Sequence, residues 1–180
     1  KNEKEKMECV CIVDWDDTIF PTSEFKDFEI EMLTTYPELE DRICKMFAEI
    51  SKHAAPYIVS NATANWINRC LAIFPKFLAL GIPYISARDF NEGFERDQWK
   101  SRTFAMICET YSAKRIITLG DMDEHVHAAR LIDSVVTSVA SIRFKPDPTL
   151  LDIYNQLDLC TAILPDIINS PTKHTILSLF

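Results

Sequence analysis

Three acidic residues, Asp14, Asp16 and Asp17, stand directly after the short apolar run Cys9–Val13 near the N-terminus. Carboxylates this close repel one another unless a cation lies among them. Asp14 and Asp16 are two residues apart, so both side chains can face one point as a strand opens into a loop. A solvated acidic turn explains the stretch equally well, because Asp favours turns and helix starts. The cluster is therefore a candidate cation site that needs support from the rest of the chain.

Two later stretches carry groups that bind anions. Ser60 and Asn61 follow the apolar run 57–59 just ahead of a helical pattern, where backbone N–H groups and the helix dipole favour a negative charge. Lys100 lies near the start of another helical pattern, and it could neutralise facing carboxylates and a phosphate if it points back to the strand ends. An ordinary helix cap and a solvated lysine are the alternative interpretations.

A second acidic cluster begins at Asp121, after the apolar run 115–119. If that run lies beside Cys9–Val13 in a sheet, Asp121 faces Asp14 and Asp16 across the carboxyl edge of the two strands. Oxygen ligands suit Mg²⁺, so the two acidic strand ends together predict a magnesium site. Capping of the next helix by acidic residues is the alternative.

The segments between these signals predict the elements that position them. Apolar runs without polar alternation are typical of strands buried on both faces; they lie at Cys9–Val13, 57–59, Tyr84–Ser86, 115–119 and 135–144. Helical patterns lie roughly at 24–35, 37–52, 64–74, 97–111, 124–131 and 148–157. Such alternation forms a parallel sheet with helices on both faces, and chemistry in these sheets sits at the carboxyl ends of strands where the strand order reverses.

In their order and placement the four signals resemble the haloacid dehalogenase-like superfamily, in particular phosphatase-type members with little or no cap. The resemblance covers roughly residues 9–145, most of the chain. It implies a Rossmann-like parallel sheet of about five strands in the order 5-4-1-2-3, with helices on both faces. The four motifs read Ile12-Val13-Asp14-Trp15-Asp16-Asp17-Thr18, Ile58-Val59-Ser60-Asn61, Lys100 and Leu119-Gly120-Asp121-Met122-Asp123-Glu124.

The resemblance implies a phosphoryl-transfer mechanism. Asp14 would be the nucleophile that attacks phosphorus to give an aspartyl-phosphate. Asp16 would protonate the leaving oxygen as general acid and then activate water as general base. Members with a carboxylate two residues after the nucleophile are phosphatases or phosphotransferases, whereas dehalogenases lack it and the ion-pumping ATPases carry Thr there. Asp16 therefore indicates hydrolysis of a phosphomonoester.

The same resemblance implies a cofactor and its ligands. Mg²⁺ would be held by the carboxylates of Asp14 and Asp121 and by the backbone carbonyl of Asp16. The phosphoryl oxygens would be bound by Ser60, Asn61 and Lys100. An anionic carboxylate can hardly attack an anionic phosphate unless the metal and a lysine first offset the repulsion, so elementary electrostatics agrees with the resemblance.

The sequence departs from the family pattern in two places. In the first motif of the family, a glycine often follows the second aspartate. Here Asp17 stands at that position, so the loop has fewer backbone conformations available and carries an additional negative charge. The fourth motif usually has a second Asp directly beside the first or three to five residues later. Here the later candidates are Asp123, Glu124 and His125. We expect Glu124 to support the site from behind the ligands.

Composition excludes several function classes. The chain has 180 residues, a formal net charge of -8 and three glycines, whose spacing fits neither a dinucleotide-binding loop nor a phosphate-binding P-loop. The acidic balance argues against a nucleic-acid partner or an anionic membrane, and no apolar run is long enough to span a bilayer. Six scattered cysteines without a C-x-x-C pair indicate free thiols in a reducing compartment, so we expect a cytoplasmic protein.

Two other functions fit the same residues. One is a catalytically idle phosphate-binding or scaffold protein, although a binding module has no need of Asp16. The other is a nuclease with two metals clamped by Asp14, Asp16, Asp121 and Asp123. That hypothesis leaves Lys100 without a role, and the chain shows no basic stripe.

Three segments are expected along the chain: a charged arm over 1–8, the α/β domain over 9–158, and a helix with an apolar tail over 159–180. The tail either packs on the domain or mediates self-association, which would give a homodimer. Between Asp16 and Ser60 lie 43 residues, enough for at most a small helical cap. We therefore expect an open site that admits a phosphorylated substrate, either a small ester or a phosphoprotein.

Overall fold

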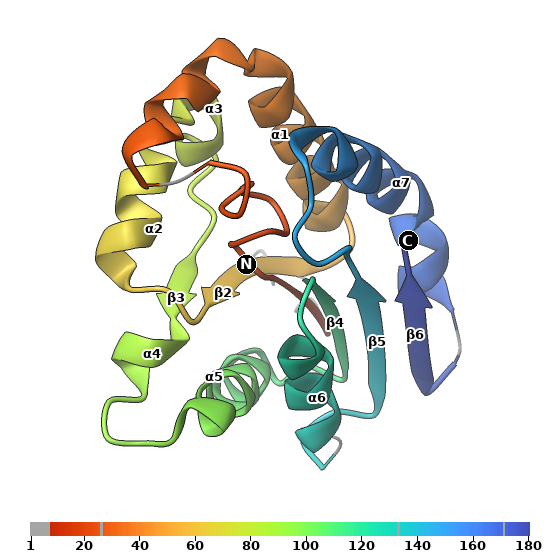
Figure 1. The fold of residues 1–180 in the computed structure, drawn as a ribbon. Helices are drawn as coiled ribbons and strands as arrows, with labels where there is room; N and C mark the ends of the chain where they lie inside the picture. The colour runs from red at the N-terminus through yellow and green to blue at the C-terminus, as the bar shows by residue number, and fades with distance from the viewer. Residues whose placement is uncertain (1–7, 26, 133, 171) are drawn as a thin grey trace, which may run out of the picture.

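A computed structural model describes residues 8–25, 27–132, 134–170 and 172–180, so nearly all of the expected N-terminal arm lies outside the described residues. Within these ranges a single sheet of six strands runs in the order β3-β2-β1-β4-β5-β6, and every neighbouring pair is parallel (Figure 1). The strands are β1 (Cys9–Val13), β2 (Ala55–Ser60), β3 (Tyr84–Ser86), β4 (Arg115–Gly120), β5 (Ser138–Arg143) and β6 (His174–Ser178). The predicted α/β class and the order of its five strands are confirmed.

Helices cover both faces of the sheet. They are the 3-10 helix η1 (Asp27–Thr35), α1 (Pro37–Ser51), α2 (Ala64–Leu71), α3 (Pro75–Leu78), α4 (Ala87–Phe90), α5 (Arg96–Tyr111), α6 (Asp123–Leu131) and α7 (Leu150–Asn169). In Figure 1, α1, α2, α3 and α7 lie above the sheet and α4, α5 and α6 lie below it. None of the helices in the described ranges is long and apolar enough to cross a membrane.

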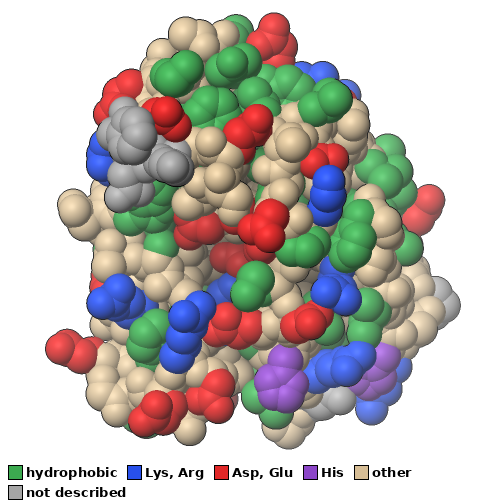
Figure 2. Space-filling model, in the orientation of Figure 1, with side chains coloured by type: hydrophobic (Ala, Val, Ile, Leu, Met, Phe, Trp, Pro, Cys, Tyr) green, Lys and Arg blue, Asp and Glu red, His purple; other side chains and the backbone are tan. Residues whose placement is uncertain are grey.

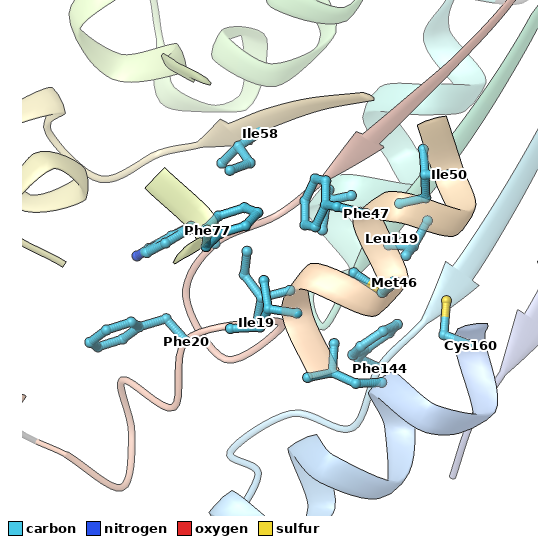
Figure 3. Packing of buried hydrophobic residues seen from close by; sticks show 14 of the residues in the cluster. Ile19, Phe20, Met46, Phe47, Ile50, Ile58, Phe77, Leu119, Phe144 and Cys160 are labelled. Carbon is cyan, nitrogen blue, oxygen red and sulfur yellow. The ribbon is translucent and has the colours of Figure 1, made fainter. Parts of the chain in front are cut away.

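Strand β1 lies at the centre of the molecule and is buried along its whole length. Because side chains alternate across a strand, Cys11 and Val13 join the core under α1 and α7, whereas Val10 and Ile12 join the core over α5 and α6. Figure 3 shows the larger of the two cores, where side chains of α1 face the sheet. The buried strand ends at Val13, and the acidic cluster begins at the next residue, Asp14.

Helix α1 belongs to this core layer. Its residues Leu39, Ile43, Phe47 and Ile50 are buried, and the helix packs against α7, α3 and β2. The longest helix between Asp16 and Ser60 thus covers the sheet instead of rising over its carboxyl edge.

The C-terminal part differs from expectation. Helix α7 is one element of 20 residues, so the boundary expected between residues 158 and 159 falls inside it. The sequence interpretation ended the helix at Leu157, but Cys160, Leu164 and Ile167 continue its buried stripe across Pro165. The chain then turns back and adds β6 to the sheet as a sixth strand, parallel to β5, where an apolar tail was expected.

Candidate active site

The site lies where the strand order reverses, at the carboxyl ends of β1, β2 and β4. Val13 is in register with Ile58 on one side and Leu119 on the other. The backbone N–H of Asp14 donates to the carbonyl of Leu119 at 2.8 Å, which extends the pairing by one residue. The parallel register therefore brings the polar residues that follow all three strands to one edge of the sheet.

A cavity of about 380 Å³ opens at this edge. Figure 2 shows acidic side chains gathered in a hollow near the middle of this face. All six residues expected from the sequence line the cavity: Asp14, Asp16, Ser60, Asn61, Lys100 and Asp121. Residues far apart in the chain thus meet in one place.

Asp14 and Lys100 form a buried ion pair at the floor of the cavity. Lys100 Nζ donates to Asp14 Oδ2 at 2.6 Å, and the two side chains are 3% and 6% exposed. The other carboxylate oxygen, Oδ1, accepts from the backbone N–H of Trp15 at 2.9 Å. Lys100 belongs to the buried face of α5, so this helix carries a charge inward against the strand end. Burial of two charges is tolerable only because they pair and bond so closely.

Asp16 is held by three donors. Its Oδ1 accepts from the hydroxyl of Thr22 at 2.6 Å and from the indole N–H of Trp66 at 2.9 Å. Its Oδ2 accepts from the hydroxyl of Ser60 at 3.2 Å. Burial raises the pKa of Asp16 above its ordinary value, although the three hydrogen bonds oppose the shift. Sequence reasoning missed Thr22 and Trp66, because nothing in their spacing indicates contact with Asp16.

Asp17 explains how the loop manages without glycine. Its φ of 54° lies in the left-handed region, where Asp is one of the few tolerated residues. Its carboxylate accepts from the backbone N–H of Ser23 at 2.7 Å and from the Ser23 hydroxyl at 2.5 Å. The Asp17 side chain therefore stabilises the turn that its left-handed backbone conformation forms.

Asp121 faces the same cavity from the end of β4. It is buried, and the hydroxyl of Thr18 lies 3.5 Å from its Oδ1. Burial, followed by the negative charge of Asp14, raises the pKa of Asp121 to about 7. Two carboxylates thus oppose each other across a cavity whose floor holds one ammonium group.

This donor set fits Mg²⁺. No group of three or more His, Cys, Asp or Glu residues in the described ranges is arranged to hold a metal ion. Mg²⁺ in phosphoryl-transfer sites is nevertheless often bound by only one or two carboxylates, with water and phosphate oxygens completing the shell. Asp14 and Asp121 supply two buried carboxylates at one cavity, and a divalent cation there would offset the repulsion between them.

Ser60 and Asn61 take different roles at the end of β2. The Ser60 hydroxyl donates to Asp16 and accepts from the backbone N–H of Ala62 at 3.0 Å. The side-chain amide of Asn61 donates to Glu124 Oε1 at 2.6 Å, and its buried carbonyl oxygen has no hydrogen-bond partner among the described residues. The Ser60 hydroxyl is therefore held between Asp16 and the Ala62 backbone, whereas the Asn61 amide is oriented by Glu124.

The sequence left the roles of three fourth-motif residues open, and the structure places Asp123, Glu124 and His125 in different surroundings. Asp123 forms an ion pair with Arg143 at 2.6 Å and is 86% exposed, and it does not line the cavity. Glu124 lines the cavity, and its carboxylate accepts a hydrogen bond from the side-chain amide of Asn61. The four carboxylates required by the two-metal hypothesis do not line one cavity in this structure.

His125 lies behind the ion pair, a position that sequence reasoning did not assign. Its Nδ1 is 4.0 Å from Asp14 Oδ2, and its side chain is 1% exposed. Burial, followed by the charge of Lys100, holds the pKa of His125 well below its usual range. The ring packs against Phe104 and against Gly120, where a Cβ would come within 2.7 Å of His125 Cγ. The glycine of the fourth motif thus makes room for the imidazole.

No protein-family model, no curated protein and no solved structure matches the chain. The fold is α/β and Rossmann-like, with a parallel sheet of six strands. Functional inference therefore starts from the geometry of the cavity.

Proposed function

We propose that the chain is a Mg²⁺-dependent phosphatase of the haloacid dehalogenase-like superfamily that hydrolyses a phosphomonoester. The observation that carries the proposal is the buried pair of Asp14 and Lys100 at the strand-order reversal, with Asp16 and Asp121 lining the same cavity. Composition alone does not place a lysine and three carboxylates around one point. Phosphoryl transfer needs this arrangement, because its catalysis consists mostly of positioning and charge stabilisation.

In the first step a carboxylate oxygen of Asp14 attacks phosphorus and the bond from phosphorus to the ester oxygen breaks. The departing oxygen takes a proton from the carboxyl group of Asp16. Thr22 and Trp66 hold that carboxyl group in place through their hydrogen bonds. The products of this step are the free alcohol and an aspartyl-phosphate on Asp14.

In the second step water attacks the phosphorus of the aspartyl-phosphate while Asp16 takes its proton. The bond from phosphorus to Asp14 breaks, which releases inorganic phosphate and restores both carboxyl groups. Lys100 and the Ser60 hydroxyl bind phosphoryl oxygens in both steps. Asp14 and Asp121 would hold Mg²⁺, which supplies Lewis-acid stabilisation of the phosphoryl charge.

The form of the cavity supports an open site. Helix α1 packs on the sheet, Ile30 and Leu33 of η1 join the same core, and residues 61–95 form α2, α3, β3 and α4 with their connections. An exposed opening suits either a small phosphoester or a phosphorylated side chain of a protein. The six free cysteines support a reducing, cytoplasmic setting.

The test is hydrolysis of 4-nitrophenyl phosphate with Mg²⁺ and with excess EDTA. We expect metal-dependent turnover that is abolished in Asp14→Asn. We expect at least a hundredfold loss of kcat in Asp16→Asn, of the order of general acid–base catalysis, with phosphate binding retained.

Asp123→Asn is the matched control, because Asp123 belongs to the same acidic motifs but lies outside the cavity; its activity should stay within about twofold. Turnover that persists in Asp14→Asn would show that the nucleophile is wrongly assigned. A folded protein that binds phosphate and Mg²⁺ but hydrolyses no ester would favour the idle binding protein.

A further inference from the structure

Two arginines line the cavity together with its carboxylates. Arg88 lies in α4 and Arg96 begins α5, and both contribute to the cavity wall. The ammonium group of Lys100 is already engaged by Asp14 at 2.6 Å. The two guanidinium groups are therefore the remaining positive charges that line the cavity among the residues described.

Helix α4 is fixed to the loop that carries the phosphate-binding residues. The hydroxyl of Ser86 donates to the carbonyl of Ala62 at 2.7 Å, and the carboxylate of Asp89 accepts from the backbone N–H of Ala64 at 2.8 Å. Arg88 stands between these two anchors. Its backbone is thus held beside the end of β2, where Ser60 lies.

Buried Asn91 joins α4 to α5. Its amide nitrogen donates to the carbonyl of Ala87 at 2.8 Å and to the hydroxyl of Thr103 at 2.9 Å, and its carbonyl oxygen accepts from Arg102 Nε at 3.2 Å. These bonds span the loop that ends where Arg96 begins α5. Both cavity arginines therefore project from backbone that is fixed by other residues.

The neighbouring Arg102 shows what a structural arginine of this segment does. It bonds Asn91 and stacks over the ring of Phe94, with its guanidinium carbon 3.6 Å from the ring centroid. Arg88 makes no hydrogen bond or ion pair with any described residue. Arg96 forms a long ion pair of 4.0 Å with Glu124 Oε2, and its side chain is 70% exposed. Neither cavity arginine is needed to hold the loop together.

We propose that Arg88 and Arg96 form an anion subsite for the leaving group, so that the preferred substrate carries a second negative charge beside the phosphate it loses. The inference rests on the phosphatase function proposed above and specifies its substrate class. The planar guanidinium fork matches a carboxylate or a phosphate in two-point hydrogen bonding. A small anionic ester and an acidic phosphopeptide share this chemistry.

The experiment compares paired esters without and with carboxylates beside the phosphate. The small pair is phenyl phosphate and 4-carboxyphenyl phosphate; the peptide pair is Ac-Ala-pSer-Ala-Ala-NH2 and Ac-Ala-pSer-Glu-Glu-NH2. We expect the charged member of at least one pair to have a kcat/KM about tenfold higher or more, since 1.4 kcal/mol of added interaction gives that factor. The pair that shows the preference identifies the source of the anion.

Substitution separates the subsite from the general charge of the protein. Arg88→Gln and Arg96→Gln should each remove most of the preference between the two members of the pair. Arg130→Gln is the matched control, because Arg130 is an exposed arginine that lines a different hollow beside β6; it should leave the preference unchanged. Equal kcat/KM values within both pairs, or equal losses in Arg88→Gln and Arg130→Gln, would overturn the proposal.

A binding measurement keeps the two proposals distinguishable. Calorimetric titration of the Asp14→Asn variant with both members of each pair measures Kd without turnover. Tighter binding of the charged ester that requires Arg88 supports the subsite, even if the native protein hydrolyses neither ester and the phosphatase proposal fails. Hydrolysis without any charge preference contradicts the subsite alone. Failure to bind any of the esters contradicts both proposals.

Discussion

Asp17 combines a left-handed backbone conformation with side-chain hydrogen bonds to Ser23. Its φ of 54° costs most residues energy, whereas glycine adopts it freely. The carboxylate meanwhile holds Ser23 by two hydrogen bonds. The sequence showed only that the expected glycine was missing. Its replacement by an aspartate that adopts the same conformation could not be inferred without the position of Ser23.

Substitution at this position should separate the two contributions. We expect Asp17→Gly to keep the turn but lose the bonds to Ser23, and Asp17→Ala to lose both. Asp17→Ala should therefore be less stable than Asp17→Gly by about 1 kcal/mol, the cost of left-handed backbone for a residue with a Cβ. Urea denaturation of the two variants measures the difference. Equal stabilities would show that the backbone conformation at Asp17 is not a constraint.

At the level of elements, the carboxyl ends of β1, β2 and β4 could be predicted to within one residue, because each is an apolar run that ends near polar residues; β2 begins at Ala55, two residues before the predicted run 57–59. The C-terminal end of helix α7 could not be predicted in the same way. The sequence interpretation ended one helix at Leu157 and expected a second one after Leu159, whereas the structure has a single helix that continues through Pro165, although proline removes a backbone donor. The helix continues because its stripe of buried residues packs on α1. Its end is fixed by Arg115, which donates to the carbonyls of Ile167 and Ser170 at 2.7 Å.

The start of α7 carries a capping box in which Thr149 and Asp152 satisfy each other's backbone N–H groups. A salt bridge to Lys145 and bonds from Thr149 lower the pKa of Asp152 to about 2, from an ordinary value of 3.8. A lowered folded-state pKa means that the stabilisation is complete above about pH 4 and disappears as the pH falls through 2.

We therefore expect Asp152→Asn to be less stable than the native protein at pH 7 and to match it at pH 2. Thr149→Ala should cost about 1 kcal/mol at neutral pH through loss of the cap. Thermal unfolding monitored by circular dichroism across the pH range measures both. A stability difference for Asp152→Asn that does not change with pH would contradict the role of its charge.

At the level of the whole molecule, stability depends on the core between the sheet and the layer of α1 and α7. Leu157 is fully buried there, whereas Leu151 on the same helix is 66% exposed. Leu157→Ala should lower the free energy of unfolding by about 2–5 kcal/mol, because it removes buried methyl groups and leaves a cavity. Leu151→Ala is the matched control and should change it by less than about 0.5 kcal/mol. Guanidinium denaturation gives both values; similar losses would mean that α7 does not pack as described.

The location of the candidate site could also be predicted at this scale, but its supporting contacts could not. Parallel strands place Asp14, Ser60 and Asp121 at one edge whatever their side chains do. The contact of Trp66 with Asp16, and the position of His125 behind Asp14, depend on how helices settle on the sheet. Such contacts join residues that no local pattern relates, so they become visible only in three dimensions.

The central position of β1 has a consequence for how the chain folds. Its partners β2 and β4 begin at residues 55 and 115, so β1 cannot complete its hydrogen bonds to both neighbours until about a hundred further residues have been synthesised. Contacts between residues so distant in sequence form slowly. Until they form, the unpaired strand edges of the incomplete sheet are exposed and prone to aggregation. Asp14 comes together with Lys100 and Asp121 only after β4 has paired with β1. Recovery of the proposed phosphatase activity after denaturation would therefore report that β1 has paired with both β2 and β4. A fragment that ends before β4 could not contain the assembled candidate site.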